Sequence, residues 1–249
     1  MDLGLQGRVA LVTGASKGIG HGIAKALVAE GASVAITSRS QERIDEAADA
    51  IGATGFAHDS ANTEGIGVLV HEIEHHLGPI EILVTNTGGP PTSPDPLSFS
   101  PDEWRTAFDQ LVLGPLAFVE ATLPEMRHRR WGRILNVVST AVREPIPDLV
   151  LSNANRSAAL ATWKTISRQA AKSGVTMNSV LPGRIATDRL YELYGSRDAA
   201  DEMAKQQIPA GRLGSVDEFA AAAAFLCSNQ ASYITGTTLV VDGGMMRSL

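Results

Sequence analysis

The sequence predicts an α/β fold in which helices cover both faces of a doubly wound parallel sheet. Short β-branched runs alternate with helical stretches, and the first run leads directly into a glycine-rich turn and a helix. Such alternation requires right-handed strand–helix–strand crossovers, which place parallel strands in one sheet and helices on its two faces. The strand candidates are residues 9–13, 34–37, 82–84, 134–138, 176–180 and 238–241.

The stretches between these strands carry apolar residues with helical periodicity. Examples are residues 20–30, 41–51 and 64–77. No repeat, low-complexity segment or proline-rich linker interrupts the pattern, so we expect one domain over residues 1–249. Two stretches are irregular: residues 88–101 are rich in proline and serine, and residues 184–212 follow a Pro-Gly turn. In an open α/β sheet both would lie over the carboxyl ends of the strands, where ligands bind.

Composition excludes several classes of protein. The net charge is −6, and the only block of like charge is the short run 128–130. This balance argues against a nucleic-acid surface or a basic membrane-bound face. Residues 1–4 do not resemble a signal peptide, and no apolar run approaches the roughly 20 residues of a membrane span, so we expect a cytoplasmic protein. The single cysteine, Cys227, has apolar neighbours and is predicted to be a buried structural thiol.

The glycine-rich turn after the first strand predicts a dinucleotide site. Glycines let the backbone approach a pyrophosphate, and the start of the following helix offers free amides and a partial positive charge. The alternative is a tight turn without a ligand, but the strand–loop–helix context favours the cofactor. The residues concerned are Thr13, Gly14, Ala15, Ser16, Lys17, Gly18, Ile19 and Gly20.

The end of the second strand indicates which dinucleotide is bound. It reads Thr37-Ser38-Arg39 and contains no acid. An acid at this place holds the ribose 2′-hydroxyl of NAD, whereas an arginine suits the 2′-phosphate of NADP. Lys17 in the first loop can reach the same phosphate. We therefore expect NADP(H), the alternative being that Arg39 and Lys17 are solvated surface charges.

Further motifs follow in order along the chain, and together with the glycine loop they resemble the short-chain dehydrogenase/reductase family. The resemblance covers essentially the whole chain and is closest to the β-ketoacyl-carrier-protein reductase-like branch. It implies a seven-stranded parallel sheet of the Rossmann type and a homotetramer with 222 symmetry. The motifs are Thr85-Asn86-Thr87-Gly88, Asn136-Val137-Val138-Ser139, Pro182-Gly183 and Val241-Asp242-Gly243-Gly244.

The resemblance also implies the remaining cofactor contacts. Asp59 and Ser60 are expected beside the adenine, and Asn86 and Gly88 beside the ribose. The amide of the nicotinamide is expected beside residues 182–187, with contacts from Pro182, Gly183, Ile185 and Thr187. The segment 184–212 would form a lid over the substrate.

The chain departs from the family at the catalytic positions. The family uses an asparagine, a serine, a tyrosine and a lysine. Ser139 matches the serine. Counting along the motifs, the tyrosine position is Ser152, the lysine position is Arg156 and the asparagine position is Leu111. Three of the four residues are therefore replaced, and Leu111 ends the family's usual proton relay.

These replacements have chemical consequences. A tyrosine hydroxyl lies roughly 6.5 Å from its Cα and a serine hydroxyl about 2.4 Å, from standard bond lengths. A general acid must come within about 2.6–3.2 Å of the atom it protonates. Ser152 therefore falls short by about 4 Å unless a water molecule bridges the gap, and it is a far weaker acid than a phenol. Arg156 could still donate to the nicotinamide ribose, with a geometry unlike that of an ammonium.

Other residues are candidates for the missing acid and for the lining of the pocket. Tyr191 and Tyr194 lie in the segment 184–212, where one could act as the acid or both could provide apolar packing. Arg143 and Asp148 follow Ser139 and could line the substrate pocket or be surface charges.

A metal-binding pattern is present but is not expected to bind a metal. His71 and His75 form a His-Glu-x-x-His sequence, which zinc peptidases use. At 100° per residue, both imidazoles fall opposite the apolar stripe of their helix, toward solvent. We therefore predict no metal site. The stripe consists of Ile66, Leu69, Ile73 and Leu77.

Two functions remain. The first is an NADP(H)-dependent oxidoreductase, ketone or 3-oxoacyl reductase-like, which acts on a small carbonyl or alcohol with Ser139 hydrogen-bonded to the carbonyl oxygen. The second is an NADP(H)-binding protein without turnover, serving as a redox sensor or an inactive subunit. Residues 111, 152 and 156 distinguish them.

Overall fold

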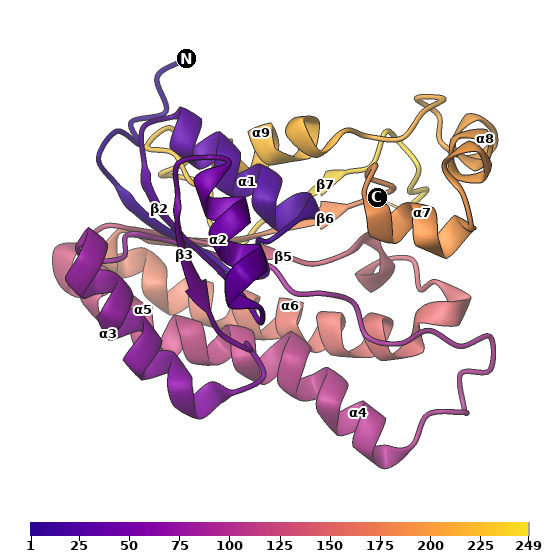
Figure 1. The fold of residues 1–249 in the computed structure, drawn as a ribbon, viewed down its shortest axis with the longest axis horizontal. Helices are drawn as coiled ribbons and strands as arrows, with labels where there is room; N and C mark the ends of the chain where they lie inside the picture. Colours follow the sequence, from indigo (N-terminus) through magenta and orange to yellow (C-terminus); the bar gives the residue numbers. More distant parts are fainter. Residues whose placement is uncertain (249) are drawn as a thin grey trace.

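The computed structural model describes residues 1–248, in which seven parallel strands form one sheet (Figure 1). The strand order is β3-β2-β1-β4-β5-β6-β7. This arrangement confirms the doubly wound, seven-stranded sheet. The strands are β1 Val9–Val12, β2 Ser33–Ser38, β3 Thr54–Ala57, β4 Ile82–Thr85, β5 Gly132–Val137, β6 Val175–Pro182 and β7 Thr238–Val241.

The main helices form two layers, one on each face of the sheet. One face carries α1, α2 and α9, and the other carries α3, α5 and α6 (Figure 1). The helices α7 and α8 lie outside these two layers (Figure 1). The helices are α1 Gly18–Ala29, α2 Gln41–Asp49, α3 Ile66–Leu77, α4 Pro101–Phe108, α5 Gly114–Arg129, α6 Val150–Ala170, α7 Asp188–Tyr194, α8 Arg197–Gln207 and α9 Val216–Leu226.

The two-residue period of the strands explains why both faces are covered. In β1, Ala10 and Val12 join the apolar cluster under α1 and α9, while Val9 and Leu11 join the cluster under α3 and α5. All four are buried. A strand whose side chains are apolar on both faces requires helices on both sides, which is why its sequence is a continuous apolar run.

The structure corrects the predicted elements at three places. The strand β3 was not among the six candidates, because it is an edge strand that begins Thr54-Gly55 and buries only Phe56 fully. The helix predicted at 64–77 begins as a 3₁₀ turn at Thr63–Gly65 and is α-helical only from Ile66. The segment 184–212, predicted as irregular, contains α7 and α8. These two helices bury a small apolar cluster of their own.

The carboxyl ends of the strands are the part of the fold that matters for function. Between β4 and α4, residues 86–100 form no helix or strand, as the proline-rich composition of 88–101 predicted. The helices α7 and α8 lie on the same side, beyond the ends of β6 and β7 (Figure 1). None of the helices in residues 1–248 is long and apolar enough to cross a membrane.

Candidate cofactor and substrate site

The turn between β1 and α1 has the backbone geometry of a close-approach loop. Gly14 and Gly18 have φ angles of 58° and 62°, in the left-handed region that favours glycine. A Cβ on Gly14 would lie 2.5 Å from the carbonyl oxygen of Asn86, and one on Gly20 would lie 2.6 Å from the carbonyl oxygen of Gly14. Side chains are therefore excluded at these positions, and the backbone of the turn stays bare.

The turn is fixed to the loop after β4 by one threonine and one asparagine. The Thr13 hydroxyl donates to the carbonyl oxygen of Asn86 at 2.9 Å and accepts from the Asn86 amide at 3.0 Å. The Asn86 side-chain Nδ2 donates to the carbonyl oxygen of Gly14 at 2.9 Å. These bonds join two neighbouring strand ends. Asn86, predicted to lie beside the ribose, thus also holds the glycine turn in place.

The N-terminus of α1 is open to a ligand. Lys17 stands at the cap position with extended backbone, and no side chain caps the first turn or places an acid in it. The free amides and the partial charge of the helix start suit a phosphate group. Ser16 and Ile19 are half-buried beside this start, while Lys17 is exposed.

The end of β2 presents a cation. Arg39 is exposed, and the Ser38 hydroxyl donates to the carbonyl oxygen of Ser40 at 3.3 Å. Within the described residues, neither Arg39 nor Lys17 forms an ion pair. Both charges are therefore available to a ligand at this strand end.

The segment after β3 lies against the start of α5. The Asp59 carboxylate accepts from the Ala61 amide at 3.1 Å. The backbone of Ser60 is so close to Gly114 that a side chain on Gly114 would collide with it. Asp59 and Ser60 are thus held at the carboxyl end of β3, next to that of β2.

The segment 182–187 approaches the glycine turn from the other half of the sheet. The Gly183 amide donates to Val241 at 2.9 Å, and Ile185 forms a bridge with Gly214. Thr187 caps α7 by accepting from the Leu190 amide at 3.4 Å. A Cβ on Gly18 would lie 3.6 Å from the Thr187 methyl group. The structure therefore brings the predicted nicotinamide segment beside the start of α1.

Gly88 lies in the exposed loop after β4, where a Cβ would meet nothing within 4 Å. No steric reason for a glycine is visible at this position.

Ser139 lies just beyond the end of β5. Its oxygen accepts from the Ala141 amide at 3.1 Å, which leaves the hydroxyl hydrogen free to donate. Its side chain is half-buried. The residue is thus placed as a hydrogen-bond donor at the edge of the sheet where the predicted cofactor residues gather.

Ser152 and Arg156 are buried together on α6, one turn apart. The Arg156 Nε donates to the Ser152 oxygen at 3.1 Å, its Nη1 donates to the carbonyl oxygen of Val137 at 3.1 Å, and its Nη2 donates to that of Thr87 at 3.4 Å. One guanidinium therefore connects α6 with the ends of β5 and β4. This connection joins the two predicted catalytic residues of α6 directly to each other.

Arg156 remains charged in spite of its burial. Loss of solvent, and secondly the charge of Arg189, lower its pKa from 12.5 to about 10. At neutral pH the guanidinium is still protonated, because the lowered pKa lies above the pH. The site thus contains a buried positive charge.

Leu111 is buried in a π-helical turn, Asp109–Leu113, which joins α4 to α5. The Gly114 amide donates to the carbonyl oxygen of Asp109, five residues back. Sequence reasoning did not predict this turn, although Pro115 offered a signal. Proline has no amide hydrogen, so the Leu111 carbonyl has no helical partner four residues on. The helix is thus irregular at the predicted asparagine position even though the side chain is apolar.

The two tyrosines that were candidates for the acid contact other residues, and the two charged residues that were candidates for the pocket face solvent. The ring of Tyr191 lies 4.8 Å from the Arg197 guanidinium, and that of Tyr194 lies 5.9 Å from Arg184. Both tyrosines also pack on the apolar cluster of α7 and α8, which favours the packing alternative. Arg143 and Asp148 are exposed, as surface charges are.

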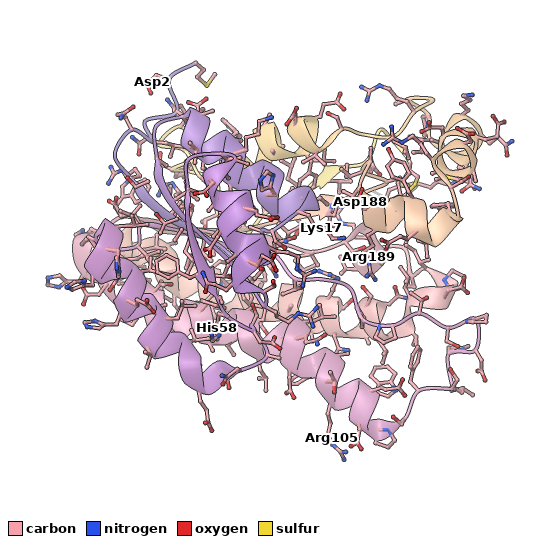
Figure 2. The ribbon with its side chains drawn as sticks, viewed as in Figure 1. Asp2, Lys17, His58, Arg105, Asp188 and Arg189 are labelled. Atoms are coloured by element: carbon pink, nitrogen blue, oxygen red, sulfur yellow. The ribbon has the colours of Figure 1, made fainter. Side chains whose placement is uncertain are left out.

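Sequence reasoning missed Arg189 on α7. Its Nη2 donates to the carbonyl oxygen of Pro90 at 3.3 Å. A side chain at Gly89 would overlap its guanidinium. Figure 2 labels Arg189 on the lower side of α7 in this view. The Gly-Gly-Pro-Pro sequence after β4 indicated that another segment packs closely against this loop. It did not indicate which residue does so.

Two further predictions concern buried and metal-binding groups. Cys227 is fully buried, as predicted, and burial raises the pKa of its thiol to about 12. His71 and His75 are both exposed on α3. The described part of the chain contains no group of three or more His, Cys, Asp or Glu side chains that could hold a metal ion.

Comparisons with known proteins agree with this geometry. The family model described as enoyl-(acyl carrier protein) reductase matches residues 14–246. The 3-oxoacyl-[acyl-carrier-protein] reductase FabG of Vibrio cholerae is 36% identical over 247 residues, covering 98% of this chain and 99% of the relative. The Aquifex aeolicus FabG is 34% identical over 253 residues, with 98% and 100% covered.

Solved structures of the same fold include two reductases. YwfH, an NADPH-dependent reductase involved in bacilysin biosynthesis, is 31% identical with a TM-score of 0.91, covering 97% of this chain and 99% of that chain. The L-sorbose reductase of Gluconobacter frateurii, solved with NADPH and L-sorbose, is 29% identical with a TM-score of 0.92 over the whole of both chains. The chain therefore belongs to the short-chain dehydrogenase/reductase family, in the branch of the 3-oxoacyl-carrier-protein reductases.

Proposed function

We propose that this chain is an NADP(H)-dependent oxidoreductase that interconverts a small carbonyl compound and its alcohol, in the manner of a ketone or 3-oxoacyl reductase. The observation that carries the proposal is the turn between β1 and α1. Two glycines with positive φ lead into a helix start that no side chain caps. Such a turn leaves amides free for a pyrophosphate. The relatives support the reaction, since each of those described above is named as a reductase.

The residues present fit a dinucleotide that carries a 2′-phosphate. Arg39 and Lys17 offer unpaired positive charges, and no acid stands at the end of β2 to hold a free 2′-hydroxyl. The rest of the cofactor is proposed to contact the residues predicted from the sequence. They are Gly14, Ser16, Gly18, Ile19, Gly20, Ser38, Asp59, Ser60, Asn86, Gly88, Pro182, Gly183, Ile185 and Thr187.

The chemistry assigned to the chain's own residues is positioning and hydrogen bonding. When bound, the cofactor supplies or accepts the hydride. Ser139 donates its free hydroxyl hydrogen to the substrate oxygen, because its own oxygen already accepts from Ala141. Ser152 accepts from the Arg156 guanidinium, which strengthens its hydroxyl as a donor. A water molecule between Ser152 and the substrate covers the distance that a tyrosine would have spanned.

Turnover with matched serine variants tests this function. We expect NADPH-dependent loss of nicotinamide absorbance with ketones or 3-oxoacyl thioesters, and a fall of about 10²-fold in kcat for Ser139→Ala, typical of losing one donor to a developing oxyanion. Ser215→Ala is the control, because Ser215 likewise accepts from a backbone amide at 3.1 Å, at the start of α9. Equal effects of the two variants on kcat would contradict the assigned role.

The second candidate is NADP(H) binding without turnover. The observation that favours it is the guanidinium of Arg156, which three acceptors of the protein already hold. Tight NADPH binding with no NADPH consumption on any of the ketones or 3-oxoacyl thioesters would select this candidate.

The predicted homotetramer also remains a proposal. The half-buried edge strand β7 supports it, and light scattering tests it.

A further inference from the structure

We infer that the substrate of this site carries a carboxylate, which Arg156 and Arg189 hold beside the loop after β4. The inference rests on the proposed function and adds the chemical class of the substrate. Arg156 belongs to α6 and Arg189 to α7, so the two cations reach the loop from different parts of the fold.

Both guanidiniums contact the same four-residue segment. The Arg156 Nη2 donates to the carbonyl oxygen of Thr87 at 3.4 Å, and the Arg189 Nη2 donates to that of Pro90 at 3.3 Å. Gly89 lies between these two contacts, and any side chain there would overlap the Arg189 guanidinium. The sequence of the loop thus admits a second arginine close to the first.

Neither arginine has its charge neutralised. Within residues 1–248 no carboxylate lies within 4.0 Å of either guanidinium. The chain has 27 Asp and Glu residues and 21 Lys and Arg residues, so the missing ion pairs do not result from a shortage of acidic residues. Arg189 is exposed, but Arg156 is buried, and a buried cation without an anionic partner is costly. An anion supplied by a ligand would remove that cost.

Arg156 also has hydrogen-bond donors to spare. A guanidinium has five N–H groups. Its Nε, one Nη1 hydrogen and one Nη2 hydrogen have acceptors in the protein, which leaves one hydrogen on each Nη nitrogen. Only 8% of the residue is exposed, so solvent has little access to these donors. These two remaining donors, one on each Nη nitrogen, match in number the two oxygens of a carboxylate.

The charge of Arg189 acts on Arg156 across the site. It is the second cause, after burial, of the lowered pKa of Arg156. Two like charges repel, and neither guanidinium has a carboxylate within ion-pair distance in residues 1–248. A carboxylate between them converts this repulsion into two favourable interactions.

The anion could come from the substrate or from the cofactor's phosphates. The substrate is favoured because Arg156 donates directly to Ser152, a predicted catalytic residue, and because the open start of α1 already serves the phosphates. The two sources give different results when NADPH and the substrate are measured separately.

The test compares carboxylic acids with their uncharged methyl esters. Pyruvate, acetoacetate and phenylpyruvate, each with its methyl ester, are titrated against protein loaded with NADP⁺ and against unloaded protein, following the thermal midpoint. The variant is Arg189→Gln. The control is Arg197→Gln, which removes an exposed cation from the start of α8 that stacks on Tyr191.

We expect at least one acid to stabilise the wild-type protein more than its ester. Arg189→Gln should weaken binding of that acid by roughly 10- to 100-fold, the usual effect of a charge-assisted hydrogen bond, and leave the NADPH dissociation constant unchanged. Arg197→Gln should retain the preference for the acid.

Three results would overturn the inference. They are equal binding of acids and esters by the wild-type protein, an acid preference that survives in Arg189→Gln, and a loss of NADPH binding rather than acid binding in that variant. Failure to bind NADPH would instead contradict the proposed function. The unloaded protein then still reports whether the arginine pair prefers a carboxylate.

Discussion

The bonds between Thr13 and Asn86 provide a direct test of how the glycine turn is held. Thr13→Val keeps the shape of a side chain that is 1% exposed but removes its hydroxyl. The Asn86 amide then loses its acceptor at 3.0 Å, and the Asn86 carbonyl loses its donor at 2.9 Å. A buried hydrogen-bonding group that is left without a partner lowers the free energy of unfolding by about 1–3 kcal/mol.

The expected magnitude is about 2 kcal/mol in the free energy of unfolding, because Asn86 is half-buried and water recovers part of the loss. For a chain of this size that corresponds to a fall of about 4–8 °C in Tm. The affinity for NADPH should fall as well, since the turn is no longer fixed to the loop after β4.

Thr176→Val is the matched control. The Thr176 hydroxyl is also buried, on β6, but it has no hydrogen-bond partner among the described residues. Replacing an unpaired buried hydroxyl by a methyl group is expected to leave stability unchanged or to raise it. Urea and thermal unfolding measure both variants. If Thr176→Val costs as much as Thr13→Val, the loss reflects the exchange of threonine for valine itself and not the bonds to Asn86.

Three further predictions concern the cofactor, the catalytic positions and the thiol. Arg39→Asp should weaken NADPH binding and improve NADH binding; an unchanged preference would place the 2′-phosphate elsewhere. Ser152→Tyr combined with Arg156→Lys should raise reductase turnover because it restores a phenol and an ammonium, and unaltered rates on the same substrates would count against the assignment of these positions. The Cys227 thiol, whose pKa burial raises to about 12, should react with a thiol reagent only after unfolding. Rapid labelling of the native protein would show that it is accessible.

The sheet could be predicted from the sequence because its central strands are apolar on both faces. The run from Val9 to Val12 is buried throughout, and β7 begins and ends at the predicted residues 238 and 241. β3 escaped prediction because an edge strand needs few buried residues, and here only Phe56 is fully buried. A local sequence pattern indicates which residues are buried. It therefore predicts the central strands of a sheet well and the edge strands poorly.

The candidate site was predicted where it depends on local backbone geometry. The glycine-rich turn was predicted from its place between a strand and a helix, and the structure adds that its glycines at 14 and 18 have positive φ. Arg189 was not predicted, because its contact with Pro90 joins residues 99 positions apart, and no local pattern encodes such a distance. The same holds for the bonds from Arg156 to Val137 and Thr87, which depend on how α6 lies across two strand ends.

Titration of the purified protein with NADPH and separately with NADH, following nicotinamide fluorescence, tests the central claim most directly. The open start of α1, together with the cations Arg39 and Lys17, predicts that NADPH binds at least about tenfold more tightly than NADH, a difference of roughly 1.4 kcal/mol. Binding of neither nucleotide would contradict the account, since both the oxidoreductase and the protein that binds without turnover require the cofactor.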